Sequence, residues 1–219
     1  MNASDVNKIT EIIMEVLKEQ GAQGGNGGND DMNIPIGISN RHLHLSQEDL
    51  EKCFGKGYEL TPIKDLTQPG QFACKETMTI CGPKGAIEKV RVLGPVRKAS
   101  QVELLAADNF KLGIKAPVRI SGDIAGSAGV TLVGPKGSVQ LEEGAIIAQR
   151  HIHMTLADAK KHGVEDGQVV AIEILGDRGG IYNNVTIRAN DSSATECHLD
   201  MEEANALGVT SKSTLKIIK

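Results

Sequence analysis

Four of the six histidines in this chain lie in two copies of a His-x-His tripeptide, His42–His44 and His151–His153. Each copy follows a short apolar run and precedes a helix-start signal, so each is predicted to lie at the exit of a strand. Residues i and i+2 of an extended chain point to the same side. Both imidazoles of a tripeptide can therefore reach one point in space, while the apolar residue between them faces the core. This geometry suits chelation of a transition metal.

The tripeptides belong to a longer internal repeat. Residues 107–114 resemble residues 202–209, and in that register Glu103 falls opposite His198. The spacing differs between the halves because the first half contains an insertion around residues 58–72. Duplicated halves often face each other about a pseudo-twofold axis, so we expect two triads of metal-capable side chains to meet. These are His42, His44 and Glu103 in the first half, and His151, His153 and His198 in the second.

Each triad matches a catalytic zinc site, which keeps a position open after three protein ligands. Cobalt, iron or manganese would fit the same donors, and the residue types do not distinguish among these metals. The alternative is that these are core or surface histidines, but two symmetric sets disfavour it. Two metal ions in one cleft can activate one reactant and accept the leaving group of another. Arg97, close to Glu103 in sequence, suits bidentate phosphate binding. Further cations that could handle anions are Lys84, Arg91 and Arg188.

The chain is predicted to be mainly β after an N-terminal helix. Apolar residues at helical spacing predict an amphipathic helix within residues 1–20, followed by a Gly-rich linker over residues 21–33. From Ile34 onward, β-branched runs around Gly-bounded turns predict three hairpins, with short helices after the histidine tripeptides. Regular short strands of this kind are typical of small barrels. The tethered helix cannot bury its own apolar face, so we expect it to bind a partner. The alternative is that it folds back onto its own body.

The amino-acid composition limits the classes of partner that this protein is expected to bind. A net charge of -4 and an aromatic content of 2% argue against a nucleic-acid binder. The sequence shows no signal peptide and no apolar run long enough to cross a membrane. The four cysteines form no C-x-x-C pair, which favours free thiols in a reduced, intracellular protein.

Three segments carry a family resemblance: residues 34–45, 93–103 and 148–154. They resemble the PduL-type phosphate acyltransferases (phosphate propanoyltransferases), and the resemblance runs from about Ile34 to the C-terminus. It implies two small intertwined β-barrels, related by internal duplication and covered by short helices. The first barrel would combine residues 34–54 with 150–219, the second would span residues 55–149, and the active site would lie between them. The first strand would then join the C-terminal half.

The resemblance also implies a reversible reaction, in which acyl-CoA and phosphate give acyl phosphate and CoA. The acyl group would be propanoyl or acetyl. The two triads would hold two zinc ions per chain, the first facing the CoA sulfur, and Arg97 would bind the attacking phosphate. No Ser-His-Asp or Cys-His grouping presents itself as a nucleophile, so we expect direct attack without an acyl-enzyme. Contacts to CoA would fall at Ile38, Ser39, Asn40, Lys84, Arg91 and Asn205.

Family members from microcompartment operons carry a tethered amphipathic helix as an encapsulation peptide. The resemblance therefore implies that residues 1–20 bind shell or core proteins. The enzyme would then lie in the lumen of a bacterial microcompartment in the cytoplasm, with a role in propanediol degradation, and we expect a homo-oligomer. Two alternatives stay open. One is a dizinc hydrolase of a thioester or phosphoester, in which the same ligands activate water. The other is a scaffold with structural zinc, which would need closed sites of four protein ligands.

Overall fold

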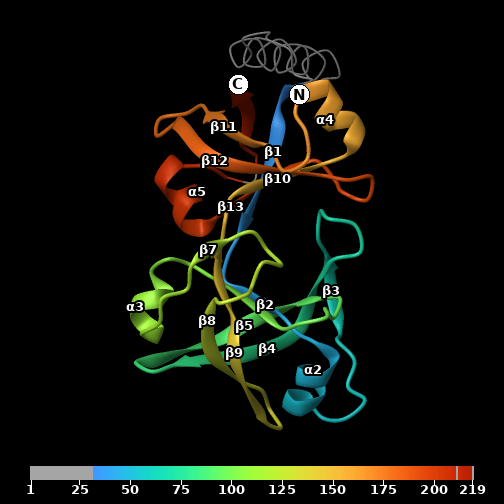
Figure 1. Cartoon of the computed structure of the whole chain (residues 1–219), viewed down its shortest axis with the longest axis vertical. Helices are drawn as coiled ribbons and strands as arrows, with labels where there is room; N and C mark the ends of the chain where they lie inside the picture. Colours follow the sequence, from blue (N-terminus) through green and yellow to red (C-terminus); the bar gives the residue numbers. More distant parts are fainter. Residues whose placement is uncertain (1–31, 211, 219) are drawn as a thin grey trace, which may run out of the picture. The chain divides into compact units, whose positions relative to one another are not determined.

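A closed barrel contains the first strand of the described chain together with strands from its C-terminal half. The computed structural model describes residues 32–210 and 212–218; the helix expected within residues 1–20 and nearly all of the linker expected over residues 21–33 lie outside them. Around the barrel the strands are β1 (Ile34–Ser39), β13 (Glu196–Asp200), β10 (His151–Met154), β12 (Gly180–Ala189), β11 (Val169–Ile174) and β14 (Thr214–Ile218). Strand β1 is parallel to β13 and antiparallel to β14. This confirms that the first strand joins the C-terminal half (Figure 1).

The other described strands form a second closed ring. Its members are β4 (Phe72–Gly82), β5 (Gly85–Gly94), β2 (His42–His44), β6 (Gln101–Leu104), β9 (Ser138–Ala148) and β8 (Ala128–Val133), and β8 pairs back to β4. Two short strands extend the ring, β3 (Pro62–Asp65) beside β4 and β7 (Val118–Arg119) beside β9. The predicted fold class, mainly β with two small barrels, is confirmed.

The pattern of strand pairing repeats between the halves, which confirms the internal duplication. Strand β2 is parallel to β5 and antiparallel to β6, and β10 is parallel to β12 and antiparallel to β13. Strands β1 and β9 are also equivalent. Strand β1 is parallel to β13, and β9 is parallel to β6, so each pairs with a strand of the other half. The two halves therefore exchange their first strands. The register sets His42 opposite Glu103 and His151 opposite His198, as the sequence repeat predicts.

The residue between the two histidines anchors each tripeptide in a barrel core. Leu43 and Ile152 are fully buried, one in each of two separate hydrophobic clusters. In a strand, their neighbours on either side point to the opposite face. Burial of one such side chain stabilises the fold by about 1.5–3 kcal/mol. The same burial fixes the direction in which two imidazoles point.

Four short helices occur in the described chain: α2 (Gln47–Phe54), α3 (Asp108–Leu112), α4 (Leu156–His162) and α5 (Met201–Leu207). The signals that follow the tripeptides are real N-caps. The Ser46 side chain accepts from the Asp49 N–H, and the Thr155 side chain accepts from the Asp158 N–H. Each cap satisfies a backbone donor, which typically stabilises a helix by about 1 kcal/mol. Within residues 32–210 and 212–218, every helix is too short or too polar to span a membrane.

The boundary between the barrels lies earlier than the sequence predicts. Residues 34–54 are expected in the first barrel, but of these only β1 pairs there. Strand β2 belongs to the second ring, and α2 packs on β9 with Leu50 and Cys53 in the second core. The exchange is limited to one strand because the apolar residues that follow it, beginning with Leu43, Leu45 and Leu50, are buried within their own half.

The insertion inferred around residues 58–72 holds β3 and a loop that contacts the other half. The Thr67 hydroxyl donates to the Glu196 carboxylate at 3.0 Å. The Gln68 side-chain amide donates to the carbonyl of Ala194 at 2.9 Å and accepts from its N–H at 3.3 Å. In a separate contact, the Glu202 carboxylate accepts from the backbone N–H groups of residues 106 and 107. These polar contacts add to the exchanged strands in joining the halves.

Replacing Ile36 by alanine should lower the free energy of unfolding by about 2–4 kcal/mol. This β1 residue is 3% exposed and packs into the core of the C-terminal barrel, so its removal leaves a cavity there. Urea denaturation measures the change. Ile181→Ala, at a β12 position that is 57% exposed, is the control and should change stability by less than about 0.5 kcal/mol. A comparably small effect of Ile36→Ala would contradict the exchanged strand.

Candidate functional site

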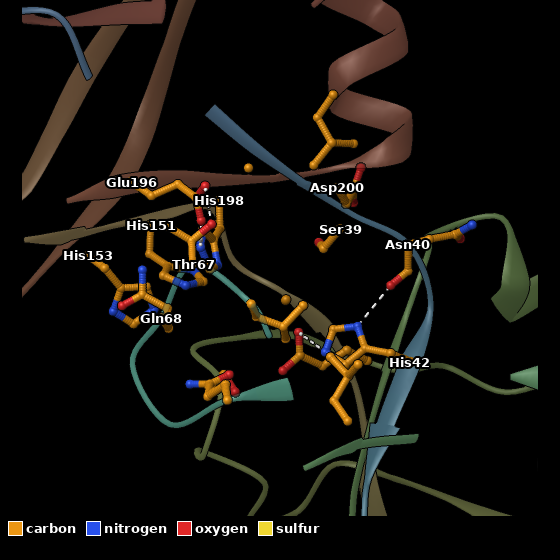
Figure 2. Close-up of a pocket in the computed structure, with 18 of the residues that line it drawn as sticks. Ser39, Asn40, His42, Thr67, Gln68, His151, His153, Glu196, His198 and Asp200 are labelled. Atoms are coloured by element: carbon orange, nitrogen blue, oxygen red, sulfur yellow. Dashed lines mark hydrogen bonds and ion pairs between the residues drawn. The ribbon is translucent and has the colours of Figure 1, made fainter. Parts of the chain in front are cut away.

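A cavity of about 610 Å³ is lined by both triads. Its walls come from strands of both barrels, β1, β2, β6, β10 and β13, and from the loop at residues 66–71. Figure 2 shows His42 on one side of this cavity and His151, His153 and His198 grouped on the other. Within each triad the potential ligand atoms all lie within 4.8 Å of one another. The fold thus brings together the side chains that the repeat predicts to meet.

The first triad presents two imidazoles with fixed tautomers beside a carboxylate. The Nδ1 atom of His42 lies 2.8 Å from the Asn40 carbonyl, and that of His44 lies 3.1 Å from the Leu93 carbonyl. A carbonyl can only accept, so each Nδ1 carries a hydrogen, and in the neutral ring Nε2 keeps the lone pair. The Nε2 atom of His42 lies 3.4 Å from the Glu103 carboxylate. The donor atoms of this triad are therefore available for a metal ion.

The second triad consists of three imidazoles with ring centroids 4.8–5.0 Å apart. His151 repeats the arrangement of His42, because its Nδ1 lies 2.8 Å from the Gln149 carbonyl. Nε2 of His198 lies 2.8 Å from the Glu196 carboxylate. The Nδ1 atom of His153 is buried and has no hydrogen-bond partner within the described residues. A buried polar atom without a partner is costly, and this donor set fits a metal ion.

The ionisation of the triads favours metal binding at neutral pH. Burial lowers the pKa of His44 to about 3, that of His151 to about 4 and that of His153 to about 3. These imidazoles are therefore neutral, which is the form that binds a metal. Burial alone would raise the pKa of the Glu103 carboxyl, but the groups around it, His42 first, lower that pKa to about 2. The first triad thus carries one negative charge that the second lacks.

Lowering the pH from about 7.5 to about 5 should destabilise the metal-free protein. Folded His44 and His151 have pKa values below the ordinary 6.5, so at pH values between the folded and ordinary pKa the unfolded chain binds more protons. Their contribution to stability is complete above the unfolded pKa. It is lost as the pH falls toward the folded pKa, by up to about 1.4 kcal/mol per pH unit for each group.

Urea denaturation of the chelator-treated protein at the two pH values tests this expectation. His44→Asn should show a weaker pH dependence than the wild type, because it removes one of the buried titrating groups. Equal urea midpoints for the wild type at both pH values would contradict the burial of neutral imidazoles.

Arg97 lies on the cavity wall and presents a positive charge beside the first triad. Its backbone N–H donates to the Leu45 carbonyl at 2.8 Å, and its side-chain Nη1 donates to the Ser121 hydroxyl at 3.3 Å. Burial lowers the pKa of Arg97, Glu103 raises it and Arg188 lowers it. The guanidinium remains charged at neutral pH, because the ordinary pKa of arginine is far above 7. Arg97 is one of four arginines that line this cavity; the others are Arg41, Arg91 and Arg188.

The residues expected to contact CoA fall into two groups. Four of them line the cavity: Ile38, Ser39, Asn40 and Arg91. Lys84 and Asn205 do not line it; Lys84 is exposed at the β4–β5 turn, and Asn205 is exposed on α5. The Arg91 guanidinium is held in place, because its Nη1 donates to the carbonyls of residues 74 and 75.

Sequence reasoning misses several polar residues at the cavity. They are Thr67, Gln68, Ser121 and Glu196, which line it, and Gln101, which contacts Glu103. The repeat register contains a signal for two of these residues, since Gln101 and Glu196 each precede the third member of a triad by two positions. The insertion that carries Thr67 and Gln68 has no counterpart in the second half, so aligning the two halves does not predict that these residues lie at the cavity.

Comparison with known proteins gives a consistent result. A family model described as phosphate propanoyltransferase matches residues 35–210. A protein of Rhodobacter capsulatus named phosphate propanoyltransferase is 49% identical over 211 residues, which cover 96% of this chain and 97% of that protein. Proteins of the same name from Thermotoga maritima and Lachnoclostridium phytofermentans are 48% and 49% identical. They cover 98% and 100% of this chain, and 97% and 100% of their own lengths.

Proposed function

This chain belongs to the phosphate propanoyltransferase family and is a transferase, and we propose that it moves an acyl group between CoA and phosphate at a pair of zinc ions. The observation that carries the proposal is the single cavity that holds both triads and Arg97. The first zinc would be held by His42, His44 and Glu103, and the second by His151, His153 and His198. Each ion would supply an electrophilic centre, one suited to the thiolate of CoA and the other to phosphate.

The protein's own residues position the phosphate. The Arg97 guanidinium offers two parallel N–H donors to phosphate oxygens, and its partial burial strengthens the attraction between its charge and the phosphate. Its backbone bond to Leu45 ties it to the end of the first tripeptide. Arg188 also lines the cavity and adds positive charge to its wall. Held in this way, phosphate meets the thioester without the entropic barrier of a free encounter.

The reaction is a direct displacement at the acyl carbon. A phosphate oxygen forms a bond to the carbonyl carbon, the C–S bond breaks, and sulfur leaves with the electron pair as the thiolate of CoA. None of the lining residues in the described chain is a cysteine. The Ser121 hydroxyl accepts from Arg97 and Gln101 and is not paired with a histidine in these contacts. Initial-velocity patterns should therefore intersect, whereas parallel lines would indicate an acyl-enzyme.

CoA is proposed to enter along β1 and β5. The backbone and side chains of Ile38, Ser39 and Asn40 would contact the part of CoA nearest the sulfur, and Arg91 would face its phosphates. The exposed residues Lys84 and Asn205 lie outside the cavity lining and would meet the nucleotide end. Propanoyl-CoA and acetyl-CoA are both proposed as substrates, because one methylene changes binding in an apolar pocket only modestly.

Thiol release from propanoyl-CoA, with and without phosphate, tests the proposed activity. We expect release to require phosphate, because the acceptor takes part in breaking the C–S bond. The alternative is a dizinc hydrolase, in which the same ligands activate water. Release that proceeds equally fast without phosphate would overturn the transferase proposal and support the hydrolase.

Residues 1–20 are proposed to target the enzyme to the lumen of a bacterial microcompartment that degrades propanediol, through contacts with shell or core proteins. We further propose that the enzyme is a homo-oligomer. Deleting residues 1–30 should leave activity in dilute solution unchanged and abolish co-purification with shell particles. A full-length chain with the same tag is the control. Unchanged packaging after the deletion would contradict the targeting role.

A further inference from the structure

We infer that Gln101 and Glu196 are matched positioning residues, each of which orients the third ligand of one triad. The inference rests on the proposed pair of metal sites. Gln101 lies on β6 opposite His44, and Glu196 lies on β13 opposite His153. They therefore occupy the same place in the two halves of the duplication. Yet one is an amide and the other a carboxylate, and each contacts a ligand of a different kind.

At the first site the amide supplies a hydrogen-bond donor to a carboxylate. The Gln101 Nε2 donates to Glu103 Oε1 at 2.7 Å and to the Ser121 hydroxyl at 2.9 Å, while Oε1 accepts from the Gly122 N–H at 2.8 Å. A backbone N–H can only donate, so the amide oxygen must face Gly122 and the NH₂ group must face Glu103. Gln101 is 2% exposed. The contact holds one oxygen of Glu103 and leaves the other, Oε2, beside His42.

At the second site the carboxylate supplies an acceptor to an imidazole. Glu196 Oε2 lies 2.8 Å from His198 Nε2, and Oε1 accepts from the Thr67 hydroxyl at 3.0 Å. A carboxylate only accepts, so His198 Nε2 carries a hydrogen, and in the neutral ring Nδ1 keeps the lone pair. This differs from His42, His44 and His151, whose backbone partners leave Nε2 free.

The two partners are not interchangeable, because each matches the chemistry of its ligand. A carboxylate in place of Gln101 would face Glu103 with like charge and no donor. Among the described residues, Glu196 is the only carboxylate with a hydrogen bond to a histidine of the second triad, and an amide in its place would remove that negative charge. With the native pair, each proposed zinc has one carboxylate nearby, as a ligand at the first site and behind a ligand at the second. Outer partners of this type change metal affinity by about 10–100-fold.

Zinc titration of the metal-free protein against a chromophoric chelator tests the pairing. The wild type should bind two equivalents. Glu196→Gln should lower the zinc affinity of the second site by about 10–100-fold and leave that of the first site unchanged. Gln101→Met should lower the affinity of the first site and leave that of the second unchanged. In a Glu103→Ala background, which removes a ligand of the first site only, Glu196→Gln should still weaken the remaining zinc and Gln101→Met should not.

Thr67→Val separates a positioning role from a packing role. It removes the loop contact to Glu196 but keeps the carboxylate beside His198, so zinc affinity should stay within about threefold of the wild type. An equal loss in Thr67→Val and Glu196→Gln would overturn the inference, as would two equivalents at wild-type affinity in both site variants. Gln101→Leu is the second variant should Gln101→Met not fold. A wild type that binds fewer than two zinc ions would instead overturn the proposed function.

Discussion

Replacing His153 by alanine should remove one of the two bound zinc ions and lower kcat about 1,000-fold, because a metal contributes several kcal/mol to stabilising developing charge. His153 belongs to a set of three imidazoles, so two ligands would remain after the substitution. Its Nδ1 is also buried without a partner in the described chain, which the substitution relieves. The folded protein should therefore be at least as stable without metal. Zinc content of the purified protein and steady-state rates with propanoyl-CoA measure the two effects.

His162→Gln is the matched control for this prediction. His162 is the one histidine of the six that belongs to neither triad, and it lies at the end of α4. This variant should keep both zinc equivalents and most of the activity. If His153→Ala still bound two equivalents with unchanged affinity, the three-histidine set would not be a metal site.

Replacing Arg97 by alanine should lower kcat/KM for phosphate about 100–1,000-fold, as removal of a preorganised donor to developing charge typically does. The KM for the thioester should change little, because Arg97 is proposed to bind the other substrate. Arg97→Lys should recover part of the loss, since it restores the charge but not the two parallel donors. Saturation curves for each substrate, with the other held constant, separate these effects.

Lys98→Ala provides the control, because Lys98 is an exposed cation next to Arg97 in the chain. Its loss changes the net charge by the same amount and should alter kcat/KM by less than about twofold. Equal losses for phosphate and thioester in Arg97→Ala would indicate that Arg97 supports the fold of the cavity and does not bind phosphate.

Much of the site could be predicted because the chain is duplicated. In each tripeptide the strand period of two places both histidines on the same face, which gives two donor side chains in each half. The apolar residue between them, Leu43 or Ile152, is buried and shows this alternation in the sequence. The third donor in each half, Glu103 or His198, follows from aligning the halves, and the strand register agrees with that alignment. The exchange of first strands leaves no local pattern in the sequence, and only the family resemblance predicts it.

The remaining features depend on contacts between distant segments. The barrel boundary falls near residue 40 and not at residue 54, because Leu43 and the residues after it pack with their own half. The loop that carries Thr67 reaches the other half through side-chain hydrogen bonds, and such polar contacts have no periodicity in sequence. The pairing of Gln101 with Glu103 is visible only once the orientation of the amide is fixed by Gly122.

The most direct test of acyl transfer at a metal pair is ³¹P NMR of phosphate and propanoyl-CoA incubated with the zinc-loaded protein. We expect a new acyl phosphate resonance to grow at the rate of thiol release, with one acyl phosphate formed per thiol. Chelation should stop both signals, and two equivalents of zinc should restore them. Thiol release without a new phosphorus resonance, or an acyl phosphate signal that persists after complete removal of metal, would contradict the account.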